Sequence, residues 1–250
     1  MEEHEYKRMY DMEEDYWWYV GLHRLVLDFL CERRLANSTH TILDAGCGTG
    51  RLITLLQSAG FKTVGIYSAG EALRLSTSRG IGDLVQASIG QIPCRTGTFV
   101  LLGSLDVLSC LVVDQRRRAF GEMRRVIKPG GYLVLNLPAY DFLRSSHDAA
   151  QHIVHRFSRG ELRSMLREAG FALEVCTYRN TVLLPLAATV RLLRRYSTNN
   201  DTCLQSDLRP IPGRVNSFLT RILLSENRLI RKGLRLPAGL SVFCIARNPR

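Results

Sequence analysis

The feature that most constrains the fold is a glycine-rich segment between two apolar runs, TILDAGCGTGRLITLL at residues 41–56. Gly46, Gly48 and Gly50 follow an apolar stretch that contains Asp44, and a second apolar stretch comes directly after them. Glycines allow backbone angles that a Cβ would block, and they let a ligand approach the main chain closely. A helix that begins after such a loop offers unpaired N–H groups to an anionic group. The segment therefore predicts a strand, a ligand-binding loop and a helix; the alternative is a tight turn that binds nothing.

The rest of the chain alternates apolar strands with amphipathic helices. Helices are expected around residues 16–35, 51–59, 71–79, 116–127 and 158–170, the last opening with a capping box formed by Ser158 and Glu161. Strands are expected at TILDA, FKTVGIY, GDLVQAS, TFVLLGSL, YLVLNL, FALEVCTY and LSVFCIAR. Such alternation predicts an α/β fold, a parallel sheet covered by helices on both faces. The last two strands are expected to pair like a hairpin at the edge of the sheet.

Length and composition favour a single domain. The chain has 250 residues, of which 46% are hydrophobic, enough for one well-buried core. It has no run of about 18 apolar residues, so no membrane-spanning helix is expected. We divide it into an N-terminal helical cap (1–37), a core (38–180), a helical insertion on the substrate side (181–236) and a final edge strand (237–250).

The positive charge is concentrated in the last third of the chain. Residues 1–155 hold 17 basic and 17 acidic residues, whereas residues 156–250 hold 17 basic and six acidic residues, which accounts for the net charge of +11. This asymmetry indicates an anionic partner, such as an acidic substrate, lipid head groups or nucleic acid. Solubility alone is the alternative explanation.

The cysteines and the N-terminus indicate a reducing compartment. Seven cysteines are scattered along the chain without a CxxC pair, so we expect free thiols and neither a zinc site nor a disulfide framework. The acidic N-terminus lacks the basic and then apolar layout of a secretion signal. We expect a cytoplasmic protein, and we leave peripheral contact with a membrane open.

Four motifs occur in an order that resembles a known family. They read ILDAGCGTG, GIYSAGEAL, QIPCRTGTFVLLGSLDVL and RRVIKPGGYLVLNLP. Together they resemble the class I S-adenosylmethionine-dependent methyltransferases, in particular the small-molecule type that includes quinone-biosynthesis enzymes, over roughly residues 38–178. The resemblance implies a Rossmann-like, seven-stranded, mostly parallel sheet with helices on both faces. It also implies S-adenosylmethionine as the cofactor.

The resemblance also implies which residues line the cofactor site. They lie in the glycine motif and at the ends of the second, third and fourth strands: Asp44, Gly46, Cys47, Gly48, Gly50, Tyr67, Ser88, Ser104 and Leu105. Tyr16 and Trp17 of the N-terminal segment are expected to close over this site.

Four positions depart from the family pattern. Tyr67 stands where the family has the acidic residue that binds the ribose hydroxyls, and Ser88 stands where an Asp approaches the adenine. Val100 and Cys110 replace the acid of an FD pair and the His of an EH pair. Loss of a carboxylate that accepts hydrogen bonds from buried hydroxyls costs about 1.5–3 kcal/mol of binding free energy. This corresponds to a tenfold to hundredfold lower affinity for the cofactor. An alternative hypothesis is therefore a catalytically inactive, methyltransferase-like binding or scaffold protein.

Candidate catalytic groups follow the fifth strand, because substrates of this fold enter at the carboxyl ends of the strands. His147 beside Asp148 is a candidate general base, and Tyr140 precedes them in the same loop. His152 and His155 stand one helical turn apart, but no third ligand at a fixed spacing is evident, so we predict no metal site. The alternative is that the histidines lie on a polar helix face.

The insertion is expected to shape the acceptor side. Its apolar stretch LLPLAATVRLLRRY carries Arg191, Arg194 and Arg195, a pattern that suits a lipid-linked or membrane-surface substrate; a lid packed on the core is the alternative. We therefore predict methyl transfer to a small or lipid-linked, anionic metabolite. Nucleic-acid methylation is a further alternative, motivated by the basic C-terminal third, but no aromatic and basic platform supports a nucleic-acid partner. The oligomeric state is not predicted.

Overall fold

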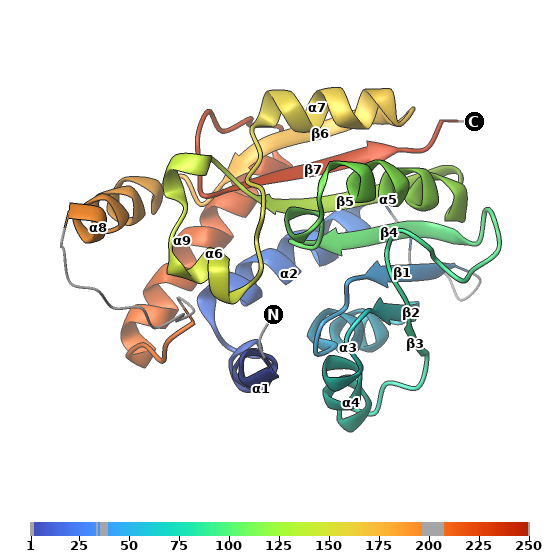
Figure 1. Ribbon diagram of the computed structural model, residues 1–250, viewed down its shortest axis with the longest axis horizontal. Coiled ribbons are helices and arrows are strands. Elements are labelled where there is room, and N and C mark those ends of the chain that lie inside the picture. Colours follow the sequence, from blue (N-terminus) through green and yellow to red (C-terminus); the bar gives the residue numbers. More distant parts are fainter. Residues whose placement is uncertain (1–2, 34, 36–39, 197–207, 250) are drawn as a thin grey trace.

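The computed structural model has a central sheet of seven strands with the order β3-β2-β1-β4-β5-β7-β6 (Figure 1). It describes residues 3–33, 35, 40–196 and 208–249, without the side chains of residues 191–196. The strands are β1 (Thr41–Ala45), β2 (Lys62–Tyr67), β3 (Leu84–Gln86), β4 (Phe99–Leu105), β5 (Ile127–Pro138), β6 (Ala172–Arg179) and β7 (Ser241–Arg247). Each matches one of the seven predicted stretches, β5 beginning five residues early.

Only β7 runs against the other strands. It pairs antiparallel with both β5 and β6, while the remaining pairs are parallel. The predicted seven-stranded, mostly parallel sheet is confirmed. The prediction that the final strand forms the edge is wrong, because β7 lies between β5 and β6 and leaves β6 at the edge. Its residues Ser241–Ala246 are all buried, as expected for a strand that is paired on both sides and covered on both faces.

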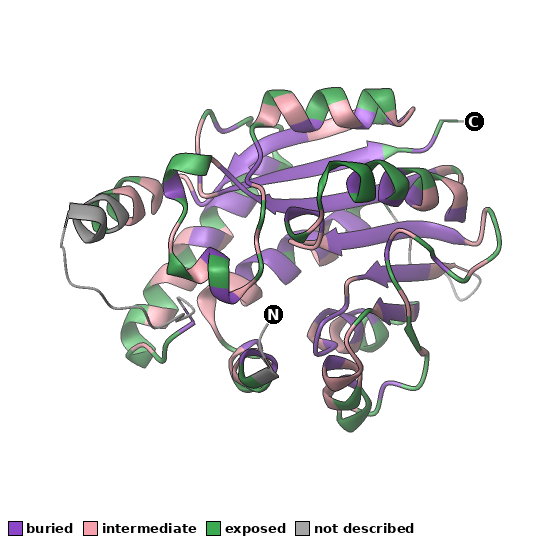
Figure 2. Ribbon diagram, in the orientation of Figure 1, coloured by how far each residue is buried: buried purple, intermediate pink, exposed green. Residues whose placement is uncertain are grey.

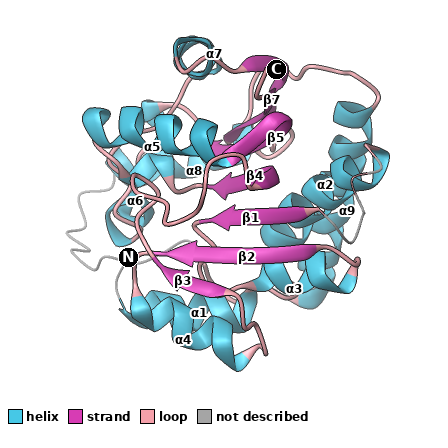
Figure 3. Cartoon of the chain, turned by 90° about the vertical axis from the view of Figure 1, so that its right-hand side faces the viewer, coloured by secondary structure: helices cyan, strands magenta, loops and turns pink. Residues whose placement is uncertain are grey.

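Helices cover both faces of the sheet. Figure 3 shows α5 on one side of the strands and α2 with α9 on the other. The α-helices are α1 (Glu3–Met12), α2 (Trp17–Glu32), α3 (Arg51–Ser58), α4 (Gly70–Ser78), α5 (Val113–Val126), α6 (Ser146–Ala150), α7 (Arg159–Glu168), α8 (Leu184–Tyr196) and α9 (Gly213–Arg231). The predicted capping box of α7 is present, since the amide of Glu161 donates to the Ser158 hydroxyl at 3.1 Å.

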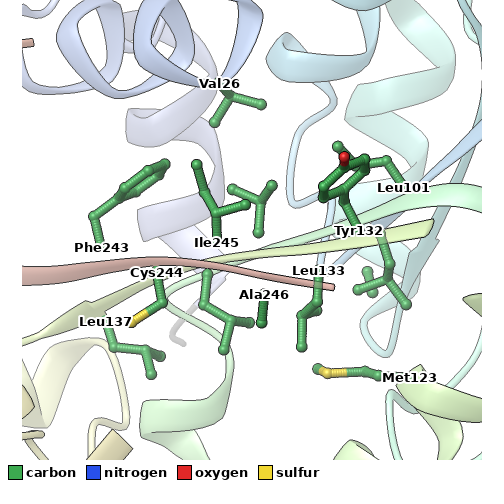
Figure 4. Packing of buried hydrophobic residues seen from close by; sticks show 14 of the residues in the cluster. Val26, Leu101, Met123, Tyr132, Leu133, Leu137, Phe243, Cys244, Ile245 and Ala246 are labelled. Carbon is green, nitrogen blue, oxygen red and sulfur yellow. The ribbon is translucent and has the colours of Figure 1, made fainter. Parts of the chain in front are cut away.

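The core lies between these helices and the central strands β1, β4, β5 and β7, which are buried over most of their length (Figure 2). Figure 4 shows Phe243 and Ile245 of β7 on the side of Val26 from α2, and Cys244 on the opposite side. Met123 of α5 packs from that opposite side. Successive side chains of β7 therefore pack alternately into the core layers on the two faces of the sheet.

The segment before β7 holds helices α8 and α9, as the helical insertion predicts. Helix α9 packs closely on α2: a Cβ at Gly21 would stand 2.7 Å from Leu223 Cδ1, and the Asn227 amide donates to the Gly21 carbonyl at 2.7 Å. The side chains of Arg191, Arg194 and Arg195, and the whole of Cys203, lie outside the described residues. Within the described residues, no helix is both long and apolar enough to cross a bilayer.

Candidate functional site

A cavity of about 560 Å³ opens at the carboxyl ends of β1, β2 and β4. It runs from the glycine loop, beneath α1, to the segment around α6, where His147 and Ile153 line it. Its size falls in the range of roughly 300–1,000 Å³ that is typical of small-molecule sites. The cavity is thus large enough for a cofactor and the reacting part of an acceptor.

The glycine loop forms one wall of this cavity. Gly46, Gly48 and Gly50 have φ angles of 109°, 54° and 87°, a region that side chains with a Cβ rarely adopt. A Cβ at Gly46 would stand 2.0 Å from a methyl of Val107, so this glycine allows the β4 loop to approach β1. Gly50 closes the turn before α3, since its N–H donates to the Cys47 carbonyl at 2.9 Å. It does not line the cavity.

Helix α1 lies over the glycine loop and is held there by Arg79. The Arg79 guanidinium donates to Glu13 at 3.0 Å and to the Tyr10 carbonyl at 2.8 Å, and its Nε donates to the Thr49 carbonyl at 3.0 Å. The Thr49 hydroxyl donates to Glu13 at 2.5 Å. Met9 of α1 approaches Gly48, where a Cβ would meet its methyl carbon at 2.7 Å. The N-terminal segment therefore forms a lid over the loop, held in place by the buried ion pair between Arg79 and Glu13.

Two carboxyl groups face the cavity beside the loop. Burial and, to a smaller extent, the nearby charge of Glu13 raise the pKa of Asp44 to about 7. Burial also raises the pKa of Glu13 to about 7, although the Thr49 hydrogen bond and Arg79 oppose the shift. Each carboxyl therefore holds its proton more tightly than in water, and a cation placed beside it would stabilise the charged form and displace that proton. The glycine loop and these acids fit a cofactor that carries positive charge on a sulfonium and an amino group.

Three of the four departures from the family pattern line the cavity. Tyr67 lies edge-on to Tyr6 of α1 with 5.9 Å between ring centroids, and burial raises the pKa of its hydroxyl. Ser88 and Cys110 also line the cavity. Val100 lies near the start of β4, away from the carboxyl ends, and does not line it.

Asp106 directly follows β4 and lines the cavity. Its φ of 61° is unusual for a residue with a side chain, and the Asn136 amide donates to both of its carboxylate oxygens at 3.1 Å. Burial raises the pKa of Asp106 to about 7, against the opposing effects of Asn136, Arg179 and Arg156. Sequence reasoning missed this residue, although it forms part of the LDVL segment of the fourth-strand motif.

Of the predicted catalytic groups, only His147 lines the cavity. Asp148 is buried and forms a bidentate pair with Arg156, with both N–O distances 2.6 Å. Arg156 lines the cavity and also donates to the Ala139 carbonyl at 3.0 Å. Asp148 therefore holds Arg156 in the wall instead of facing the acceptor side itself.

Tyr140 also lies outside the cavity lining. Its ring stacks on Tyr178 at 5.0 Å and on Phe142 at 5.3 Å between centroids. Ser104 is fully buried within β4. The predicted cofactor residues that do line the cavity are Asp44, Gly46, Cys47, Gly48, Tyr67, Ser88 and Leu105. The expected closing residues Tyr16 and Trp17 line it as well.

The described residues contain no group of three or more His, Cys, Asp or Glu side chains that could hold a metal ion. His155 instead contacts Glu161, with 2.7 Å from Nε2 to the carboxylate. Besides Asp106, sequence reasoning missed Tyr6, Glu13 and Arg156 as lining residues. Glu13 sits in an acidic N-terminal stretch that offers no local signal of a ligand site.

Comparison with known proteins shows that the region around this cavity is similar to methyltransferases. A model of a methyltransferase domain matches residues 43–135. Malonyl-[acyl-carrier protein] O-methyltransferase of Enterobacter lignolyticus is 29% identical over 218 residues, which cover 83% of this chain and 81% of that protein. A tRNA (carboxymethyluridine(34)-5-O)-methyltransferase of Arabidopsis thaliana is 32% identical over 101 residues, 40% of this chain but only 24% of that protein.

Solved structures share the fold at low sequence identity. Geranyl diphosphate C-methyltransferase of Streptomyces coelicolor, solved with S-adenosyl-L-homocysteine, superposes with a TM-score of 0.58 at 15% identity. The match covers 88% of this chain and 77% of that one.

Proposed function

The chain belongs to the class I S-adenosylmethionine-dependent methyltransferases, and we propose that its acceptor is a small or lipid-linked metabolite methylated inside the cavity described above. The observation that carries the proposal is the continuity of that cavity, from the glycine loop to a half lined by Asp106 and His147. In-line transfer needs the donor and the nucleophile held in one enclosed space. A single cavity of about 560 Å³ supplies that space.

The cofactor half comprises the glycine loop, Glu13, Asp44 and Tyr67. S-adenosylmethionine supplies an electrophilic methyl group on a positively charged sulfur. The two carboxyl groups would stabilise the positive charges of the bound cofactor, and α1 would exclude water from it. Tyr67 stands where the family has an acid, so ring packing with Tyr6 would take over part of the contact with the nucleoside.

Two candidate proton acceptors, Asp106 and His147, line the acceptor half. Asp106 adjoins Val107, which contacts the glycine loop, and Asn136 fixes its carboxylate. We propose that Asp106 accepts a proton from the acceptor, or orients it, and that His147 approaches from the opposite wall. A pKa near the working pH suits a general base.

The far wall of the acceptor half carries several apolar side chains beside Arg156. They are Trp18, Ile153, Leu208 and Leu240. This wall favours an acceptor with an apolar portion, and the relative that acts on a malonyl group of acyl-carrier protein supports oxygen as the methylated atom.

The proposal is tested by following a labelled methyl group from S-adenosylmethionine into three classes of acceptor: a total lipid extract, a panel of small carboxylic acids and phenols, and tRNA. We expect label in lipid or small-molecule products. Label that enters only tRNA would contradict the proposal and favour the RNA acceptor of the Arabidopsis relative.

An active-site variant sharpens this test. Asp106→Asn keeps the size of the side chain but removes the base, so kcat should fall about 10²–10⁴-fold. Asp114→Asn, at an exposed position on α5, is the matched control and should leave kcat unchanged. Equal activity of both variants would exclude Asp106 as the base.

A further inference from the structure

Exposed apolar side chains gather on the last helices before β7. Of the twelve large apolar side chains that are exposed in the described part of the chain, seven lie between residues 182 and 234. On α8 and just before it, Val182, Leu186 and Val190 recur at intervals of four residues, which places them on one face. Phe218 of α9 is 63% exposed. Large apolar groups gathered on one part of a surface mark an interaction site.

Basic side chains accompany these apolar groups along α9. Arg214, Arg221 and Arg228 recur every seven residues, and all three are exposed. Val215 and Leu229 follow directly after the first and the last of them, and are also exposed. We call Arg214, Val215, Phe218, Arg221 and Leu229, which share this side of α9, the basic-apolar face.

The opposite side of α9 is already occupied. Leu223, Asn227 and Ile230 are buried, and Asn227 donates to Gly21 of α2. The inward side therefore meets the packing needs of the helix, and the basic-apolar face is not required by the core. Arg214, Ser217, Phe218 and Arg221 instead line a shallow surface hollow.

This face begins beside residues that line the cavity. The Asn216 side chain accepts from the Trp17 amide at 2.9 Å and donates to the Asp15 carbonyl at 2.7 Å, which ties the first turn of α9 to the start of α2. Trp17 itself lines the cavity. Figure 1 shows α8 and the first turns of α9 at the end of the molecule toward which the parallel strands point.

We propose that the basic-apolar face of α9 docks on an anionic phospholipid surface and brings the cavity to a lipid-linked acceptor. The helix would lie in the interface, with Val215, Phe218 and Leu229 among the acyl chains and the arginines at the head groups. Charge favours this occupant, because residues 181–236 carry ten basic and three acidic residues. RNA would use the charge but gains little from exposed valine and leucine side chains, so the mixture favours a membrane. The inference rests on the proposed lipid-linked acceptor.

The test is flotation of the purified protein with vesicles of neutral phosphatidylcholine, or of phosphatidylcholine with 30% phosphatidylglycerol. We expect at least tenfold more bound protein on the anionic vesicles, and less as salt is raised from 50 to 500 mM. Two double variants should each reduce this binding at least tenfold. One combines Val215→Ser with Phe218→Ser, and the other combines Arg214→Gln with Arg221→Gln. A matched control, Val113→Ser with Arg117→Gln on the exposed side of α5, should bind like the wild type.

Three outcomes would overturn the proposal: no binding to anionic vesicles, binding that both α9 variants retain in full, or binding abolished by a stoichiometric amount of RNA. A dimer that the α9 variants dissociate, without any vesicle binding, would assign the face to a second copy of the chain and also overturn it. Binding of S-adenosylhomocysteine is measured on the same samples. If the nucleoside binds and vesicles do not, only the docking proposal fails; if vesicles bind and the nucleoside does not, only the proposed function fails.

Discussion

At the scale of single residues, Tyr67 shows how the cavity accommodates the loss of a family carboxylate. The ring packs edge-on against Tyr6 of α1 and lies beside Cys47 of the glycine loop. The acidic groups that remain in this half, Asp44 and Glu13, come from β1 and from the segment after α1.

Tyr67→Asp should weaken binding of S-adenosylhomocysteine about tenfold, a loss of about 1.4 kcal/mol. The new carboxylate would be buried without a cation, and the packing with Tyr6 would be lost. Tyr67→Phe, which keeps the ring, should stay within about threefold of the wild type in the same calorimetric titration. Tighter binding by Tyr67→Asp would instead indicate a decayed site that the acid repairs.

Asp44 and Glu13 make cofactor binding depend on pH. Both have a pKa raised to about 7, and a bound cation favours their charged forms. Below pH 7 each must release a proton on binding, so the affinity for S-adenosylmethionine should fall up to tenfold per pH unit for each proton released. Titration at pH 6 in two buffers of different ionisation enthalpy measures these protons. The Glu13→Gln variant should release one proton fewer on binding. An affinity that does not depend on pH would contradict the role of Asp44 and Glu13 in cofactor binding.

The same shifts set the sign of a stability effect. The folded, unliganded protein holds these two protons more tightly than the unfolded chain, in which the carboxyls have ordinary pKa values near 4. Their contribution to the free energy of unfolding is therefore present in full below pH 4 and is lost as the pH rises to about 7.

Asp148 contributes to stability through its buried pair with Arg156. Asp148→Asn leaves the guanidinium buried without a counter-ion and should lower the free energy of unfolding by about 3–5 kcal/mol in urea denaturation. Asp141→Asn, which breaks a solvent-exposed pair with Arg144, is the matched control and should cost less than about 1 kcal/mol. Equal, small losses would show that the buried pair is not a structural tie.

At the scale of elements, the strands and most helices could be predicted, but α1 as a separate helix could not. Strands such as β4 are continuous apolar runs, and α7 carries its capping box in the sequence. Helix α1 (EHEYKRMYDM) has little apolar pattern, so its sequence alone does not predict it. It is held by a contact distant in the chain, since Arg79 pairs with Glu13, 66 residues before it. The position of β7 inside the sheet was also missed, since a run of buried residues does not reveal which strands it pairs with.

Arg79→Ala should release α1 from the glycine loop. It removes the ion pair with Glu13 and the bonds to the Tyr10 and Thr49 carbonyls together. Hydrogen exchange should then rise at least tenfold in residues 3–12, while amides of β1 and β4 stay protected. Arg74→Ala, which breaks an exposed pair with Glu71 on α4, is the control and should leave α1 unchanged. Unchanged exchange in Arg79→Ala would show that α1 is held by other contacts.

At the scale of the whole molecule, the sequence predicts the cofactor half better than the acceptor half. The glycine loop is local, so seven of the nine predicted cofactor residues line the cavity. The acceptor half is assembled from α1, α2, α6 and the β4 and β7 ends, which are distant in the chain. Asp148 was chosen because it adjoins His147, but on α6 neighbouring side chains point in different directions, and Asp148 turns to Arg156.

The central claim is that one cavity takes an adenosyl cofactor between the glycine loop and the α1 lid. Calorimetric titration of the full chain with S-adenosylhomocysteine tests it most directly. We predict saturable binding of one ligand per chain, weakened in Arg79→Ala. No heat and no thermal shift at millimolar ligand would contradict the account.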